Sequence, residues 1–329
     1  MRTLRSRAPR PLRAGLVATL LLSPSLLAAQ SAADAALCER QGDARHPEAR
    51  AQVRERAQGG TPAAAFFAGC AALADGDAGR AAEALERAVR ADDASAVAHF
   101  WLGRAYGEQA QKANVFRQAS LARKTKAEFE RAVQLDPAYI DARVGLIRYY
   151  LLAPGVLGGS TERARAQVEE IRRRNPYRGA FAAVDVATRQ KDTASVTREY
   201  RQLIAQYPDS SGPWVALISL LATQQRWDEA FATTERLLQA QPASPVAPYL
   251  IGRLASQSGQ QLERGEQALR RYLGTTPRPG DPPLANAHYR LGGILERQGR
   301  KDQARAEYEA AVALDPKLKV ARDALAKLR

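Results

Sequence analysis

The chain is poor in the residues from which catalytic and metal sites are usually built. Its 329 residues include two cysteines, Cys38 and Cys70, and three histidines, His46, His99 and His288. No two of them are spaced like a pair of zinc ligands, so we expect no metal site. A Gly-x-Ser-x-Gly nucleophile elbow, a His-Glu-x-x-His motif and a phosphate loop ending in Gly-Lys-Ser/Thr are also absent. These absences predict that the chain is not an enzyme and binds no cofactor.

Apolar runs long enough to span a bilayer, about 20 residues, are missing as well. The apolar stretch at residues 14–27 is interrupted by polar residues and a proline; five arginines precede it and small residues follow it. A basic head, a short apolar middle and a small-residue end are typical of a secretory signal peptide. We therefore predict a signal peptide over residues 1–30 and an exported, periplasmic chain with no stable membrane span. An uncleaved N-terminal anchor is the alternative.

Charge of one sign is not concentrated in any part of the remaining sequence. The formal net charge of +14 falls to +9 when the five arginines of the predicted leader are removed. Elsewhere Glu and Arg are mixed, as in Glu162-Arg163 and in the two glutamates before residues 172–174. Such mixing is typical of solvated helix faces. Proteins that bind nucleic acid usually gather cations and stacking aromatic residues on one element, so we expect no nucleic-acid partner.

The two cysteines have a structural interpretation. Export would place them in a compartment where disulfides persist. We therefore predict a candidate disulfide between Cys38, in an N-terminal helical segment over residues 31–61, and Cys70, in the helices that follow. The alternative is a pair of buried thiols that act as small apolar residues.

Proline recurs after predicted helices at nearly regular intervals. Successive prolines in these positions are separated by 39, 32, 34, 35 and 39 residues. A proline ends one helix and is tolerated in the first turn of the next. A period near 34 with two helices in each unit indicates a helical solenoid. The pairs that contain these prolines are Asp136-Pro137, Asn175-Pro176, Tyr207-Pro208, Gln241-Pro242, Thr276-Pro277 and Asp315-Pro316.

The last unit has the clearest pattern. It reads His288-x-x-Leu291-Gly292-x-x-Leu295, then Ala304-x-x-x-Tyr308-x-x-Ala311, then Pro316. This pattern resembles the tetratricopeptide repeat, in which an aromatic-x-x-Leu-Gly-x-x-Tyr helix precedes an Ala-x-x-x-Phe helix and a proline. Gly292 and Ala304 allow two antiparallel helices to approach closely. Gly299 provides the turn, because glycine tolerates the left-handed conformation that ends a helix.

The same pattern recurs in about seven units from residue 62 onward. His99-x-x-Leu102-Gly103-x-x-Tyr106 opens one of them and Trp214-x-x-Leu217 opens another. The resemblance implies an all-α fold, a right-handed α-solenoid of helix-turn-helix repeats. We predict a repeat domain over residues 62–316 and a C-terminal capping helix over residues 317–329, since repeat arrays need a polar cap at the end.

The polar residues of the units have structural interpretations. His99 and His288 stand where the repeat places a large packing residue, which favours packing over general-base catalysis. Acidic pairs such as Asp92-Asp93 and Asp228-Glu229 fall at helix junctions or helix starts, where they complement the helix dipole. No neighbouring group in sequence would raise the pKa of one member, so we do not interpret them as catalytic carboxylates.

The resemblance also implies a concave groove lined by the first helix of each unit. Tyrosine and arginine are the residue types enriched in interaction hot spots. We therefore predict that a partner protein or peptide binds there, and the alternative is that several of these side chains fill gaps between helices. The predicted groove residues are Phe100, Arg104, Tyr139, Leu146, Tyr149, Tyr249, Arg253 and Tyr289.

Two adjacent units are longer than the rest. About ten extra residues fall within residues 107–118, and an apolar, glycine-rich stretch at residues 153–160 separates the helices of the next unit. Insertions in solenoids map to loops on one face, often the binding face, so we expect the two to be neighbours. The insert-loop residues that we predict to contact a partner are Val115, Phe116, Pro154, Val156 and Leu157.

The functional prediction is a non-catalytic interaction or assembly scaffold in a bacterial cell envelope, monomeric or weakly oligomeric. An assembly factor for outer-membrane insertion, pili or cytochromes would differ only in its partner, and the lack of a Cys-x-x-Cys pair argues against cytochromes. A homo-oligomer formed through the chain ends is a further alternative, which the polar C-terminal segment disfavours. The alternative of another class is a repeat-built envelope enzyme, a hydrolase or polysaccharide-modifying enzyme. It would require two carboxylates, or a histidine and a carboxylate, within hydrogen-bond reach in a cavity.

Overall fold

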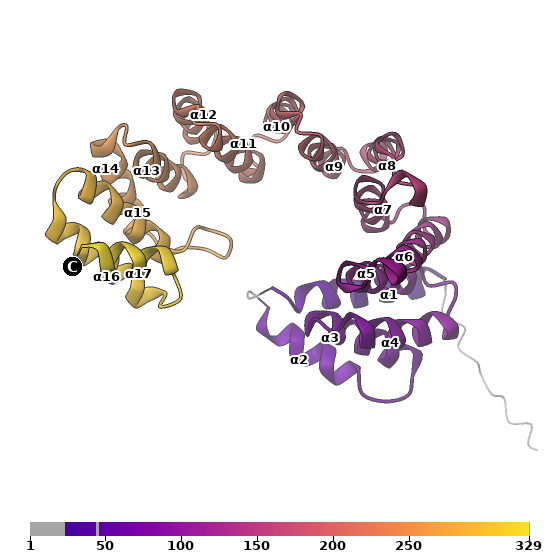
Figure 1. Cartoon of the computed structure of the whole chain (residues 1–329). Helices are drawn as coiled ribbons and strands as arrows, with labels where there is room; N and C mark the ends of the chain where they lie inside the picture. The colour runs from indigo at the N-terminus through magenta and orange to yellow at the C-terminus, as the bar shows by residue number, and fades with distance from the viewer. Residues whose placement is uncertain (1–23, 44–45, 329) are drawn as a thin grey trace, which may run out of the picture. The chain divides into compact units, whose positions relative to one another are not determined.

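Figure 1 shows a computed structural model of the chain, which describes residues 24–43 and 46–328, with side chains from residue 32. This part of the chain contains helices and no strand. The N-terminal segment holds α1 (Pro24–Arg40) and α2 (Pro47–Arg56), and the chain ends with α17 (Lys319–Lys327). The predicted signal peptide rests mainly on residues 1–23, which lie outside the described residues.

Between these ends, seven consecutive helix pairs follow one another. They are α3 (Pro62–Ala74) with α4 (Ala78–Ala91), α5 (Ala96–Lys112) with α6 (Val115–Leu135), α7 (Ile140–Leu152) with α8 (Thr161–Arg174), α9 (Pro176–Arg189) with α10 (Thr193–Gln206), α11 (Ser211–Thr223) with α12 (Trp227–Ala240), α13 (Val246–Ser258) with α14 (Leu262–Leu273), and α15 (Leu284–Arg297) with α16 (Lys301–Leu314). A short 3-10 helix, η1 (Gly155–Leu157), lies between α7 and α8. The predicted all-α, helical-repeat solenoid is confirmed.

The chain divides into two compact units, residues 1–101 and 102–329. In the first unit a disulfide between Cys38 and Cys70 joins α1 to α3. The Gln41 side chain also donates to the backbone oxygen of Cys70 at 2.8 Å. Arg50 and Arg54 of α2 pair with Asp75 at the end of α3, and the hydrogen bond from Arg50 is the main cause that lowers the pKa of Asp75.

In the second unit, glycine lets the two helices of a pair approach closely. A Cβ atom added at Gly292 would lie 2.6 Å from the ring of Tyr308, and one added at Gly103 would lie 2.7 Å from the ring of Phe129. Both distances are too short for real atoms, so the large side chain of the second helix occupies the space that the glycine leaves. The predicted close approach at Gly292 is therefore present, and Gly103 repeats it.

Most turns inside the pairs use the left-handed conformation, but not always with glycine. Gly299 has φ 79°, as its position after a helix predicts. Lys191 and Gln225 occupy the equivalent turns of the α9/α10 and α11/α12 pairs with φ 59° and 56°. Because a Cβ atom is crowded in this conformation, these two turns are less favourable than the glycine turns.

The last helix, α17, covers the end of the array. Its Ala321 is fully buried, and Leu325 and Leu328 pack against the core of the preceding helices. Arg305 of α16 donates to the backbone oxygen of Leu328 at 2.5 Å. A short helix that is apolar on one side and charged on the other thus stands where the sequence predicted a cap.

Candidate functional site

Four of the eight predicted groove residues lie in the core. Phe100, Leu146, Tyr149 and Tyr249 are each less than 9% exposed. The ring of Tyr249, for example, packs against that of Tyr272 with centroids 5.4 Å apart. These four side chains fill space between helices, which was the alternative for part of the set, and in this structure they offer little surface to a partner.

The other four predicted residues, Arg104, Tyr139, Arg253 and Tyr289, are half-buried. Arg253 has the most unusual surroundings among them. It lies on α13, the first helix of its pair, and its Nη2 donates to the hydroxyl oxygen of Ser219 on α11 at 3.0 Å. Among the described atoms its Nε is buried and has no hydrogen-bond partner.

The surroundings of Arg253 disfavour its charged form, as burial also does at Arg143. Burial, the largest cause, lowers the pKa of its guanidinium; Tyr249 acts in the opposite direction, and the nearby charge of Arg290 on α15 lowers the pKa further. No carboxylate pairs with Arg253 in the described part of the chain. Helix α13 contacts both α11 and α15, so the three first helices bring Ser219, Arg253 and Arg290 together. We call these three residues the Arg253 cluster.

Arg143 shows what a fully satisfied buried arginine looks like in this fold. Its Nε and Nη2 donate to the backbone oxygen of Pro137 at 3.1 and 2.8 Å, and its Nη1 donates to the Gln167 side chain at 2.8 Å. Glu170 lies 4.0 Å away. Arg143 therefore joins the α6–α7 turn to α8, whereas Arg253 keeps donor capacity and positive charge that the chain itself does not use.

The insert residues are mostly exposed, but the first insert is not a loop. Helix α5 continues to Lys112 and α6 begins at Val115, because the inserted sequence is rich in helix-forming Ala, Gln, Lys and Arg. Val115 and Phe116 start α6 with 78% and 92% of their side-chain area exposed. We call residues 112–118 the α5–α6 tip.

The second insert forms a hydrogen-bonded turn that includes η1. The Tyr149 hydroxyl donates to the backbone oxygen of Leu157 at 2.7 Å, and Ser160 caps α8. Within this turn Pro154 is exposed, Val156 is 94% exposed and Leu157 is half-buried. Helix η1 contacts α6, and a Cβ atom added at Gly158, next to η1, would lie 3.6 Å from Nζ of Lys126, which lies beyond the α5–α6 tip.

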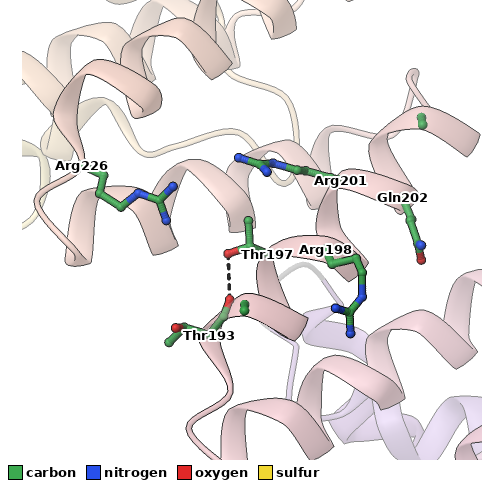
Figure 2. A pocket seen from close by; sticks show the side chains of 8 residues that line it. Thr193, Thr197, Arg198, Arg201, Gln202 and Arg226 are labelled. Atoms are coloured by element: carbon green, nitrogen blue, oxygen red, sulfur yellow. Dashed lines mark hydrogen bonds between the residues drawn. The ribbon is translucent and has the colours of Figure 1, made fainter.

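A surface pocket that the sequence did not predict lies between α10 and the start of α12 (Figure 2). Its volume is about 560 Å³. The residues that line it are Thr193, Ala194, Thr197, Arg198, Arg201, Gln202, Ala205 and Arg226. The α10 residues recur at helical spacing, so the sequence indicates that they share one helix face. The pocket also includes the start of α12, and no local sequence pattern indicates that this segment lies beside α10.

The charge of this pocket is largely compensated by the protein. Arg226 holds both carboxylate oxygens of Glu229, with a shortest ion-pair distance of 2.6 Å, and Arg201 lies 3.4 Å from the same carboxylate. Arg198 donates to Ser195. All three guanidinium groups are exposed, so water and salt screen them. The pocket has room for a small polar group. Because its cations are exposed and mostly paired, we expect it to bind an anion more weakly than a half-buried cation without a carboxylate partner would.

A histidine and a carboxylate do lie within hydrogen-bond reach of each other. Nδ1 of His288 on α15 is 2.7 Å from Oε2 of Glu307 on α16. The pair joins the two helices of the last repeat and does not line the α10–α12 pocket. In the described residues no group of three His, Cys, Asp or Glu side chains could hold a metal ion, and no helix is long and apolar enough to cross a membrane.

Comparison with solved structures agrees with the helical-repeat fold. Yeast Tom70 is 11% identical with a TM-score of 0.53, and the match covers 82% of this chain and 57% of Tom70. A tetratricopeptide repeat protein from Parabacteroides merdae is 16% identical with a TM-score of 0.45, covering 85% of this chain and 98% of that one. Pseudomonas aeruginosa pilF is 14% identical with a TM-score of 0.42, covering 72% and 98%. No curated protein matches the sequence.

Two family models match the sequence itself. The model of the tetratricopeptide repeat matches residues 285–318, the unit in which the pattern was clearest, so this resemblance is confirmed. The model described as the TRAP transporter T-component matches residues 29–228, which is more than half of the chain. The chain therefore belongs to the TRAP transporter T-component family and is built from tetratricopeptide-like helix pairs.

Proposed function

We propose that the chain is a non-catalytic, exported component of a TRAP transporter that binds another protein of that system. The binding surface is the one formed by the first helices of the helix pairs, which we call the first-helix surface. The observation that carries this proposal is the family match over residues 29–228 in a chain made of stacked helix pairs. The predicted leader supports export and a periplasmic setting. Helical-repeat surfaces of this kind commonly serve as scaffolds for protein contacts.

The Arg253 cluster is the contact that we propose on this surface. Arg253 is half-buried, its Nε lacks a partner, and Arg290 adds a second positive charge nearby. A carboxylate of a partner, either a side chain or a C-terminus, would accept hydrogen bonds from the remaining Nη–H groups of Arg253 and compensate the charge. Charge-assisted hydrogen bonds of this kind are among the stronger polar contacts. Of the predicted groove residues, Arg253 is thus the one that we propose as a partner contact. The buried aromatic residues of that set position the helices behind it.

The proposal is tested by affinity capture of the tagged chain from its own cell envelope, followed by mass spectrometry. We expect other proteins of a TRAP transporter to be enriched over a tagged unrelated repeat protein. Arg253→Gln should reduce that enrichment about tenfold, because it removes a charge-assisted contact. Arg322→Gln, at an exposed site on α17, is the matched control and should leave capture unchanged. If no transporter protein is enriched with the unaltered chain, the proposed function is wrong.

A structural role for Arg253 gives a different result. If Arg253 mainly supported the fold, Arg253→Gln would lower the free energy of unfolding together with capture. We expect that free energy to change by less than about 1 kcal/mol, because the variant removes a buried donor that has no partner together with a single hydrogen bond to Ser219. If Arg253→Gln captures transporter proteins normally, the contact lies outside the Arg253 cluster. The proposal that the chain is a TRAP transporter component would not be affected.

A further inference from the structure

Exposed apolar side chains gather around the two inserts. Six large hydrophobic residues are exposed in the described part of the chain, and four of them, Val115, Phe116, Leu152 and Val156, lie in or beside the inserts. Phe116 and Val156 are more than 90% exposed. Isolated exposed apolar residues are common, but an exposed phenylalanine beside an exposed valine at the start of a helix indicates a surface that something covers.

These side chains are held by local structure. The Asn114 side chain caps α6 by accepting a hydrogen bond from the backbone N–H of Arg117 at 3.1 Å, and Gln118 donates to the backbone oxygen of Ala110 at 3.3 Å. The second insert is held by the Tyr149 and Ser160 hydrogen bonds described above, and η1 contacts α6. The protein therefore presents Phe116 and Val156 from hydrogen-bonded backbone on two elements, α6 and η1, that contact each other.

The α5–α6 tip and the following turns of α6 carry cations between Glu108 and Glu128. Residues 109–127 contain five cations and no Asp or Glu, and residues 151–160 contain no charged residue. Lys126 pairs with Glu130 at 3.4 Å, and Lys124 lies over the Tyr106 ring at 4.8 Å. Arg117 and Arg123 are exposed. Apolar side chains that protrude among cations match an anionic lipid surface, where the apolar groups enter the interface and the cations stay near the headgroups.

We propose that the α5–α6 tip, together with the η1 turn that contacts α6, docks reversibly on an anionic phospholipid bilayer. Phe116, Val115 and Val156 insert into the interfacial region, while Arg117 and Arg123 contact lipid phosphates. This contact requires no membrane-spanning helix, and none is present in the described residues. It would orient the chain beside a transporter in the same membrane, and it does not depend on which protein the Arg253 cluster binds.

Vesicle co-sedimentation tests this proposal. The chain is expressed with its own leader and purified, and every variant is prepared in the same way, so the N-terminal segment contributes equally to all. We expect binding to vesicles of phosphatidylcholine with about one third phosphatidylglycerol, and much weaker binding to phosphatidylcholine alone. Added salt should weaken the binding because it screens the cations.

Two variants and a control assign the contact to the tip. Phe116→Ser and Arg117→Gln/Arg123→Gln should each lower the partition coefficient on anionic vesicles, the former about tenfold. Leu314→Ser, which replaces an exposed leucine on α16, should have no effect. The proposal is overturned if the unaltered chain does not distinguish anionic from neutral vesicles, or if both tip variants bind like the control. Loss of protein capture by Phe116→Ser with vesicle binding unchanged would likewise overturn it and assign the tip to a protein.

Discussion

The last helix pair, α15/α16, and the first pair with an insert, α5/α6, follow the same packing rule but have different surfaces. In both pairs a glycine of the first helix receives an aromatic ring of the second, Gly292 with Tyr308 and Gly103 with Phe129. The second helix is 14 residues long in α16 and 21 in α6. The extra length carries Val115 and Phe116 into solvent. In both pairs the same contact packs the two helices together, and the extra length of α6 exposes apolar surface.

The largest expected effect is a difference in the free energy of unfolding between substitutions of two phenylalanines on the same helix, α6. Phe129 is 6% exposed and Phe116 is 92% exposed. Phe129→Ala should lower the free energy of unfolding by about 4 kcal/mol because it leaves a cavity against Gly103. Phe116→Ala should change it by less than about 0.5 kcal/mol. Urea unfolding followed by circular dichroism measures both, and equal losses would contradict the division between the packed part of α6 and its tip.

The disulfide gives the next largest effect, and it is confined to the first unit. Replacing Cys38 and Cys70 by serine removes a link between α1 and α3 that encloses 32 residues in sequence. We expect a loss of about 3 kcal/mol in the local stability of this unit. Hydrogen exchange of peptides from α3 should become faster while exchange in α15 and α16 stays the same. Uniform acceleration along the chain would show that the two units do not unfold separately.

A substitution in the last pair tests whether the glycine contact is needed. Gly292→Val places a side chain where the Tyr308 ring lies, so we expect a loss of about 2 kcal/mol from overpacking. Gly274→Ala is the control, because its added Cβ meets only atoms at 3.5 Å or more and its φ is −79°. If both variants unfold at the same urea concentration, the close approach is not what maintains this pair.

The smallest expected effect is a gain in stability in the middle repeats. Lys191→Gly and Gln225→Gly should each raise the free energy of unfolding by about 0.5 to 1 kcal/mol, because glycine adopts the left-handed conformation without a Cβ clash. The same change at Lys301, in helical conformation at the start of α16, should not stabilise the protein. A loss of stability at both turns would mean that the two native side chains make favourable contacts there.

The fold was predictable because its determinants are local and periodic. Proline spacing and the Gly299 turn predict where helices end, and the Gly292 position predicts a close approach of two helices. The structure contains seven helix pairs with a short helix at the end. The insert at residues 107–118 was located correctly in sequence, but its helical conformation was not predicted. Its helix-forming residues were outweighed in our interpretation by the expectation that insertions form loops.

The candidate site was predictable only in part, because repeat spacing does not say which side chains of a first helix are covered by the next pair. Tyr249 and Arg253 are one helical turn apart, yet Tyr249 is buried against Tyr272 and Arg253 keeps a donor without a partner. The α10–α12 pocket requires two helices from different pairs. No single motif indicated the transporter family, which was found from similarity spread over 200 residues.

The central claim is that the first-helix surface around Arg253 contacts another transporter protein, and site-specific photo-crosslinking in intact cells tests it most directly. A photoreactive side chain at Arg290, within the Arg253 cluster, is compared with one at Leu314, which is 56% exposed on α16. We expect a crosslink from position 290 to another TRAP transporter protein and none from position 314. Crosslinks to that protein from position 314 alone, or from neither position, would contradict it.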